Sequence, residues 1–318
     1  MQTPATLYIV VPCYNEQDAL PQTNQRLGQL LDELVAADKV SDRSRVLYVS
    51  DGSTDDTWPI IEQLGAQSGS RVCGVKLAAN AGHQHALLAG LTVAKEHADI
   101  TVSIDADLQD DPQAIPQMLD HYYDGCDIVY GVRRKRSTDT WFKRTTALAF
   151  YRGMHLLGAK TIYNHADYRL MSRRAVEALC NYPERNLFLR GIVPLLGYRS
   201  ATVEYDRAER QAGKSKYTLG RMLNLAFDGI TSFSVRPVRW VFSLGIIFLF
   251  VALGILIYVV HSLITGDKVP GWASLMLSLW FVGGAVLVGL GVVGEYIGKI
   301  YLEVKQRPRF NIEQTLIR

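Results

Sequence analysis

Several carboxylates and one side-chain amide gather where an apolar run ends. The segment ITVSIDADLQDDPQ, residues 100–113, carries Asp105, Asp107, Gln109, Asp110 and Asp111. Crowded carboxylates repel one another unless a cation lies among them. Two carboxylates two residues apart on a turn can share a divalent ion, and an amide oxygen can join them. Hard oxygen donors of this kind suit Mg²⁺ or Mn²⁺ next to a phosphate group. A solvated loop is the alternative.

Asp110 and Asp111 have a simpler explanation than metal binding. The sequence DDP is typical of a helix cap followed by proline at the first helical position. We therefore expect these two residues to begin the next helix. Asp105, Asp107 and Gln109 remain the metal-ligand candidates.

Basic residues form two further groups. The first, Arg133 to Arg136, directly follows the apolar run DIVYG, where an anionic ligand could bind; a solvated basic loop is the alternative. The second lies within residues 207–221, before a long apolar segment, at the depth where lipid phosphates lie. General attraction to anionic headgroups explains its charge but not the sequence GKSK (213–216), which is typical of a mobile phosphate-binding loop.

Short apolar runs alternate with helical periodicity in the first 130 residues. The predicted strands are 7–12, 45–50, 71–77, 99–105 and 127–131, and the predicted helices lie within 18–38, 55–67 and 82–97. This alternation predicts an open, mostly parallel sheet with helices on both faces. Ligands of such sheets bind beyond the carboxyl ends of the strands, where the acidic segment lies. No glycine-rich dinucleotide or P-loop motif follows a strand.

Two uncharged segments near the end of the chain predict a transmembrane hairpin. Residues 240–264 and 269–294 each exceed the roughly 20 apolar residues that cross a bilayer. Buried helices of a soluble core are the weaker alternative, because such helices usually keep a polar face. Basic residues flank the outer ends of the pair, so the positive-inside rule places both termini in the cytoplasm. We expect a multi-pass protein of the inner membrane, without a signal peptide.

The bulk composition excludes little by itself. A net charge of +3 is too small to indicate a nucleic-acid partner. Four widely spaced cysteines, without a Cys-x-x-Cys pair, are typical of reduced thiols rather than of zinc ligands or a disulfide framework.

The chain resembles the polyprenyl-phosphate glycosyltransferases of glycosyltransferase family 2. The segments that carry the resemblance are VVPCYNE (10–16), VSDGSTDDT (49–57), NAGHQHALLAG (80–90), DADLQDDP (105–112), GVRRKRSTDTW (131–141), NHADYRLMSRRAV (164–176), ERNLFLRG (184–191) and 206–234. They occur in order over nearly the whole chain, and bacterial bactoprenol glucosyltransferases look most similar. The resemblance implies an A-type glycosyltransferase fold followed by a two-helix transmembrane hairpin.

The resemblance also implies roles for individual residues. The nucleotide of the donor would contact Pro12, Tyr14, Glu16 and Asp51. The metal would be held by Asp105, Asp107 and Gln109, with Asp107 and Asp167 at the catalytic position. The phosphates of donor or acceptor would be bound by Arg133, Arg134, Arg210, Ser215 and Lys216. No role is assigned to His83, where many relatives carry Lys or Gln, and His85 is read as structural.

The implied reaction is inverting transfer of a sugar from a nucleotide sugar, with UDP-glucose the best expectation, to a polyprenyl phosphate. The expected parts are a cytoplasmic catalytic domain (1–205), a basic loop with an interfacial helix (206–239), two spans (240–264 and 270–294) and a basic tail (295–318). Glycines of the second span favour a homo-oligomer through the membrane helices. The sequence does not distinguish Asp167 as a base from Asp167 as a positioning group.

Two rival functions are open. A processive polysaccharide synthase resembles this chain at the sheet, and the sequence RPVRW (236–240) is similar to its motif. However, that string adjoins a span, and two spans are few for a polymer channel. A non-catalytic membrane scaffold would be free to lose Asp105, Asp107 and Asp167, yet all three are present.

Overall fold

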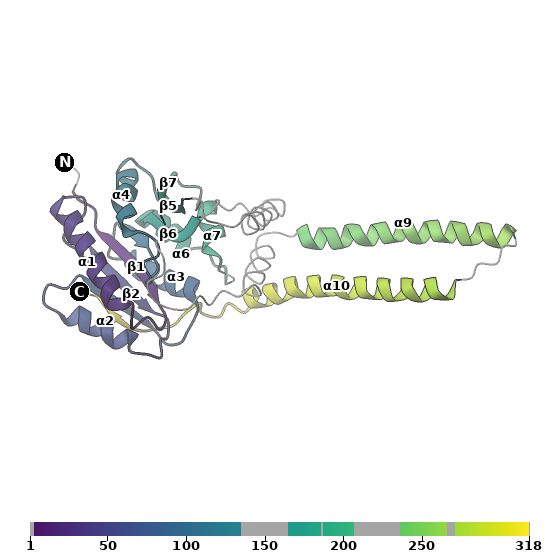
Figure 1. Ribbon diagram of the computed structural model, residues 1–318, viewed down its shortest axis with the longest axis horizontal. Helices are drawn as coiled ribbons and strands as arrows, with labels where there is room; N and C mark the ends of the chain where they lie inside the picture. Colours follow the sequence, from purple (N-terminus) through teal and green to yellow (C-terminus); the bar gives the residue numbers. More distant parts are fainter. Residues whose placement is uncertain (1–2, 135–164, 186, 207–235, 266–270, 318) are drawn as a thin grey trace. The chain divides into compact units, whose positions relative to one another are not determined.

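The strands of the structure form one sheet whose central part is parallel. The computed structural model describes residues 3–134, 165–185, 187–206, 236–265 and 271–317 (Figure 1). The strands are β1 (Leu7–Cys13), β2 (Arg45–Ser50), β3 (Val72–Leu77), β4 (Ile100–Ser103), β5 (Ile128–Arg133), β6 (His165–Ser172), β7 (Ser200–Tyr205) and β8 (Ile312–Leu316). Their order is β7-β5-β6-β4-β1-β2-β3-β8, and only β6 and β8 run antiparallel to their neighbours. The five strands predicted between residues 7 and 131 are confirmed to within a few residues.

Helices cover both faces of this sheet. The helices of this unit are α1 (Leu20–Ala36), α2 (Thr57–Ala66), α3 (His83–Ala94), α4 (Ile115–Tyr123), α6 (Arg173–Cys180) and α7 (Leu189–Ile192), with short 3-10 turns η1 (Pro112–Ala114) and η2 (Val193–Leu196). Alternate β1 residues Leu7, Ile9 and Val11 share a buried cluster with α1, α2 and α4. On the other face α3 approaches closely, since a Cβ at Gly90 would lie 2.5 Å from Val10. The sheet with two helical layers matches the A-type fold.

The carboxyl end of β1 explains how the acidic segment leaves the sheet. Val10 pairs with Ser103, the last residue of β4, and the Val10 carbonyl accepts a hydrogen bond from Ile104 N at 3.1 Å. Backbone groups of alternate residues face the same side, so Pro12 faces the side where β4 has already ended. Its missing N–H therefore costs no ladder hydrogen bond. Beyond Ser103 the chain is free to turn out of the sheet.

The C-terminal residues return to the sheet and pair with β3. Strand β8 lies antiparallel to β3, and Ala78 N donates to the Asn311 carbonyl at 2.9 Å. Lys76 and Glu313 form an ion pair at 3.2 Å across the two strands. Part of the expected basic tail (295–318), the segment Ile312–Leu316, thus contributes an edge strand of the sheet.

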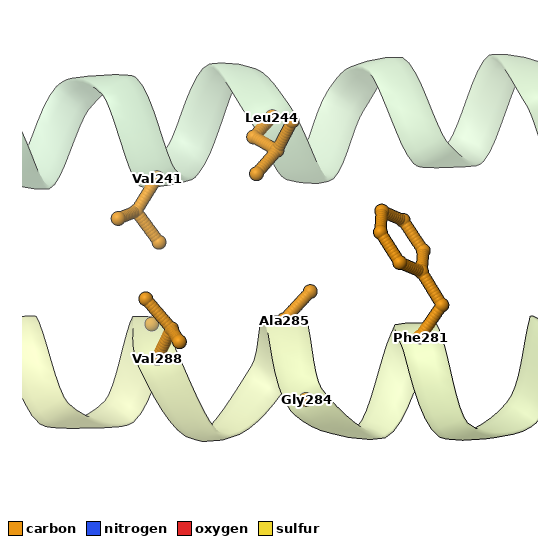
Figure 2. A pocket seen from close by; sticks show the side chains of 7 residues that line it. Val241, Leu244, Phe281, Gly284, Ala285 and Val288 are labelled. Carbon is orange, nitrogen blue, oxygen red and sulfur yellow. The ribbon is translucent and has the colours of Figure 1, made fainter.

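Two long apolar helices form a second unit. Helix α9 runs from Arg236 to Thr265 and α10 from Trp272 to Val304. Windows within them, Val238–Ile255 and Phe281–Val304, are long and apolar enough to cross a membrane. Figure 2 shows apolar side chains of the two helices facing each other, and the Phe248 and Phe281 rings meet edge to face at 5.6 Å. Residues 207–235, with the expected interfacial helix, lie outside the described part of the chain.

Candidate active site

The loop after β4 presents the three predicted metal ligands on one side. Burial alternates along it: Asp105, Asp107 and Gln109 are partly exposed, whereas Ala106 and Leu108 are buried. Leu108 adopts a left-handed backbone with φ +46, which a bulky residue rarely does. The burial of the Leu108 side chain in the core offsets that strain.

Asp105 lies in a region of excess negative charge. Its pKa is raised by partial removal from water and by the charges of Asp110, Asp167 and Asp107, while His83 at 3.6 Å opposes the rise. Elsewhere in the loop, the Asp107 carboxylate accepts from Gln109 N at 3.2 Å. A cation would relieve the repulsion around Asp105.

This donor set fits Mg²⁺ or Mn²⁺. Among the residues that the structure describes, no three His, Cys, Asp or Glu side chains gather as a metal cage. Mg²⁺ commonly takes only one or two protein carboxylates and completes its shell with water and substrate phosphate. Asp105 and Asp107 therefore suit an ion shared with a phosphate group.

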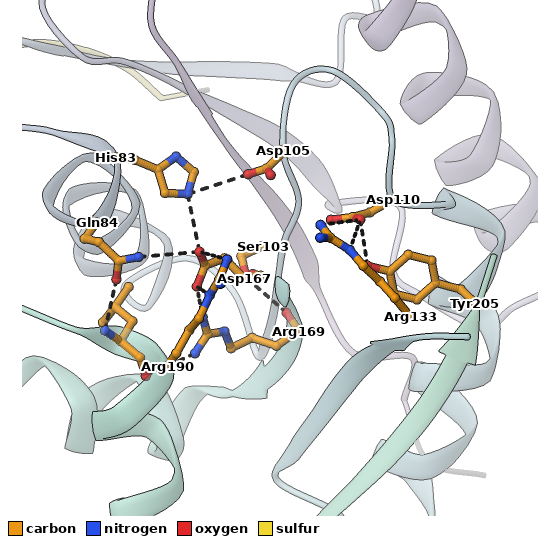
Figure 3. A network of polar contacts seen from close by, with 11 residues as sticks. His83, Gln84, Ser103, Asp105, Asp110, Arg133, Asp167, Arg169, Arg190 and Tyr205 are labelled. Carbon is orange, nitrogen blue, oxygen red and sulfur yellow. Dashed lines mark hydrogen bonds and ion pairs between the residues drawn. The ribbon is translucent and has the colours of Figure 1, made fainter. Parts of the chain in front are cut away.

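On one side of Asp105, two arginines hold the buried carboxylate of Asp167 on β6. Arg169 Nη2 donates to Oδ1 at 2.6 Å, and Arg190 of α7 reaches both oxygens, Nε at 3.3 Å and Nη2 at 3.0 Å (Figure 3). Gln84 donates at 3.4 Å, and His83 Nε2 lies 3.8 Å away. Although burial opposes it, Arg190 and Arg169 hold the pKa of Asp167 well below its usual range.

On the other side of Asp105, the buried carboxylate of Asp110 holds Arg133. Arg133 Nη2 donates to Asp110 Oδ1 at 3.0 Å, and the Tyr205 hydroxyl donates to the same oxygen at 2.6 Å (Figure 3). The expected helix-capping role is confirmed for Asp111, which accepts from Gln113 N at 3.0 Å at the start of η1, but is wrong for Asp110. Asp110 turns inward because the partly buried guanidinium of Arg133 is available there as a partner.

Of the other predicted phosphate-binding residues, the structure describes only Arg134, which does not join this site. Arg134, the neighbour of Arg133, is exposed and pairs with Asp206 at 3.3 Å and Glu204 at 3.6 Å. Arg210, Ser215 and Lys216 lie outside the described residues. The role of Arg134 remains a prediction.

The predicted nucleotide-binding residues lie at the ends of β1 and β2. Tyr14 is exposed and Glu16 partly buried, while the carboxylate of Asp51 is buried and accepts from the backbone of the loop before α3, Ala81 N at 2.7 Å and Gly82 N at 3.0 Å. Beside Asp51, Gly52 has φ +60, and a Cβ there would lie 2.4 Å from Asn80 N, so only glycine fits. The loops after β1, β2 and β3 are thus packed together at the same edge as Asp105.

Four residues of the site were not predicted: Gln84, Arg169, Arg190 and Tyr205. Arg169 and Arg190 lie in segments that carry the family resemblance, but nothing in their local sequence marks them. Gln84 accepts from Leu189 N at 2.9 Å and donates to Asp167, so it connects two segments about a hundred residues apart. His83, to which no role was assigned, lies between Asp105 and Asp167. Only the folded chain brings these residues together.

Comparison with known proteins decides the family. The model of the family "Glycosyl transferase family 2" matches residues 8–180. The chain belongs to this family. It is 52% identical over 99% of its length to the uncharacterized glycosyltransferase YkoT of Bacillus subtilis, and covers 93% of that protein. It is also 40% identical to the SfII prophage-derived bactoprenol glucosyl transferase of Shigella flexneri, over 96% of this chain and 97% of that one.

Among solved structures, one similar protein is the mannosyltransferase PcManGT of Pyrobaculum calidifontis in complex with GDP-Man and Mn²⁺. The two chains are 17% identical with a TM-score of 0.48, over 94% of this chain and 85% of that one. Similarity at this level does not assign the bound nucleotide sugar or metal of that protein to this chain. The family 2 match itself identifies the chain as a glycosyltransferase with the A-type fold.

Proposed function

We propose that this family 2 transferase moves a sugar, with inversion, from a nucleotide sugar to a polyprenyl phosphate, and that the donor is UDP-glucose. The observation that carries the proposal is the 40% identity to bactoprenol glucosyl transferases over nearly the full length of both chains. That alignment covers 96% of the chain and so includes most of the two apolar helices, which would hold an enzyme at the membrane that contains a lipid acceptor. Undecaprenyl phosphate is the expected acceptor.

The chemistry requires positioning more than proton transfer. An oxygen of the acceptor phosphate forms the new bond to the anomeric carbon as the bond to the donor's diphosphate breaks on the opposite face. The acceptor oxygen is already anionic near neutral pH, so no base need deprotonate it. The low pKa of Asp167 is consistent with this. Arg169 and Arg190 bind its carboxylate and lower its pKa, which makes it a weak proton acceptor.

Negative charge builds up on the departing diphosphate and raises the activation barrier. Stabilising that charge is the main way in which the protein can lower the barrier. A divalent ion held by Asp105, Asp107 and Gln109 would neutralise part of that charge. Arg133 lies on the side of Asp105 opposite Asp167, and its guanidinium is held by Asp110 and Tyr205. A guanidinium fixed in advance stabilises a developing negative charge without reorganisation, so Arg133 suits a phosphate oxygen.

The setting proposed for the reaction is the inner face of the cytoplasmic membrane. Helices α9 and α10 would span it, with both termini and the catalytic domain in the cytoplasm, as the flanking basic residues favour. The lipid phosphate would be bound by Arg210, Ser215 and Lys216. Small residues of α10 favour a homo-oligomer formed through the membrane helices. The product would serve glycosylation of an envelope polymer.

Incubation of membranes that contain the protein with labelled nucleotide sugars tests the proposal. Label from UDP-glucose that extracts with lipid, and that depends on added undecaprenyl phosphate, is the expected result. Label in a polymer would favour the polysaccharide synthase, and label in neither fraction with any donor would favour the scaffold. Parallel reactions with other UDP and GDP sugars identify the donor.

A further inference from the structure

Arg190 lies at the site with one end of its guanidinium anchored. It is the second residue of α7, and its Nε and Nη2 both bond the Asp167 carboxylate. Its side chain is 37% exposed. Among the described residues, none accepts a hydrogen bond from its remaining nitrogen, Nη1. The guanidinium is therefore fixed on one edge and available on the other.

The backbone that carries Arg190 is fixed as well. Leu189 N donates to Gln84 Oε1 at 2.9 Å, and the Leu189 carbonyl accepts from Arg169 Nη1 at 3.4 Å. Gln84 and Arg169 also bond the Asp167 carboxylate. The two side chains that hold Asp167 in place thus also hold the start of α7. This double anchoring sets where the Arg190 guanidinium points.

The local charge does not balance. Within the Asp167 group alone, two guanidinium groups, Arg169 and Arg190, face the one carboxylate, which leaves an excess of one positive charge (2 − 1) when His83 and the neighbouring metal-ligand candidate Asp105 are left uncounted. Arg169 is only 2% exposed, and both of its terminal nitrogens are engaged inside the protein. The excess charge is therefore presented by Arg190.

Arg190 is within electrostatic range of the other charged groups of the site. Burial opposes ionisation, but Asp167 raises the pKa of Arg190, with Asp105 adding to the effect and Arg133 opposing it. A cationic group on the side of Asp105 opposite Arg133 (Figure 3) is well placed for an anion that also approaches a metal at Asp105. Phosphate is such an anion, and arginine binds its oxygens through directed N–H groups.

We propose that Arg190 binds a phosphate oxygen during transfer, and that Asp167 is the positioning residue that aims its guanidinium. The proposal rests on the proposed function. The phosphate is either that of the donor's diphosphate or that of the lipid acceptor, since the same chemistry recognises both. Asp167 then acts through Arg190 and takes up no proton.

The test compares Arg190→Ala and Arg190→Lys with Arg173→Ala in the full-length protein. Arg173 is a matched control because it is also a partly exposed arginine paired with an aspartate, Asp99 at 3.1 Å, but lies at the opposite end of β4. Asp167 keeps its bond to Arg169 in both Arg190 variants, so the buried carboxylate stays paired. Thermal unfolding checks that each variant is folded.

We expect Arg190→Ala to lower kcat/KM about 100-fold or more, as loss of a transition-state donor does, and Arg190→Lys to lie between. Added guanidinium should restore part of the Arg190→Ala activity, which it would not do for a purely structural loss. Binding of uridine diphosphate and of undecaprenyl phosphate in detergent is measured separately. Weaker binding of the first assigns the donor's diphosphate, and weaker binding of the second assigns the lipid phosphate.

Three results would overturn the proposal: normal turnover in Arg190→Ala, unchanged binding of both phosphates without guanidinium rescue, or an equal loss in Arg173→Ala. Failure of the proposed function looks different. Wild-type protein would then form no lipid-linked sugar from any donor, whereas the two binding measurements would still report on Arg190.

Discussion

Asp110 and Asp167 are both buried aspartates that bind an arginine beside Asp105, but the two groups differ in net charge. Asp110 faces one arginine and a tyrosine hydroxyl, which balances its charge. Asp167 faces two arginines, one of them fully buried. The balanced group fixes Arg133 in place, whereas the unbalanced group offers a spare positive charge to a ligand. A third pair, Asp127 with Arg174, extends the comparison to the surface, because Arg174 is 66% exposed.

The largest effect on stability is expected at Asp167. Asp167→Asn keeps the shape but leaves the charge of buried Arg169 uncompensated, and loss of one partner of a buried pair costs about 3–5 kcal/mol. Thermal or urea unfolding of the purified protein measures this. If Asp167→Asn lowered the free energy of unfolding no more than Asp110→Asn does, the cost would not follow the burial of the partner arginine, which would contradict this account.

Asp110→Asn should cost less. Arg133 is 25% exposed, so water can solvate part of its charge when the carboxylate is lost, and we expect a decrease of about 1–2 kcal/mol in the free energy of unfolding. The same unfolding experiment applies, with Asp111→Asn on the adjacent residue as the control. A cost as large as that of Asp167→Asn would mean that Arg133 is desolvated as fully as Arg169.

The smallest effect is expected at Asp127, and it should depend on pH. Hydrogen bonds from Arg174 lower the pKa of Asp127, with Ser172 adding to the effect and burial opposing it. A carboxyl whose pKa is lower in the folded state stabilises the protein above its unfolded pKa, about 3.9, and loses that contribution as the pH falls. The difference in melting temperature between wild type and Asp127→Asn should therefore shrink between pH 6 and pH 3. A constant difference would contradict the pairing.

The sequence predicts the central sheet because each strand is a nearly continuous apolar run. It does not predict β8, whose residues are mostly exposed and show no apolar pattern. The shared, partly exposed side of Asp105, Asp107 and Gln109 follows from the sequence, since residues 105–109 alternate polar with apolar. Arg133 is the last residue of β5 and Arg134 directly follows it, and the two side chains have different partners because successive residues of an extended chain point to opposite sides.

The Asp167 group is the part that sequence reasoning alone does not reach. Its members come from α3, β6 and α7, and each has an ordinary neighbourhood in the chain. Arg169 and Arg190 acquire their meaning only from the shared carboxylate of Asp167. Convergence of this kind is set by the antiparallel pairing of β6 with β4 and β5, which no local pattern records.

The central claim is that the acidic loop between the Asp110 and Asp167 groups serves sugar transfer to a polyprenyl phosphate. Measuring sugar transfer by the Asp105→Asn variant tests this claim most directly. Wild type and variant are assayed with UDP-glucose, undecaprenyl phosphate and Mg²⁺ or Mn²⁺, together with their melting temperatures in the absence of metal. We predict transfer at least about 100-fold lower, as for loss of a transition-state contact, with a melting temperature equal to or above that of wild type because carboxylate repulsion is relieved. Near-normal transfer by the variant would contradict the account.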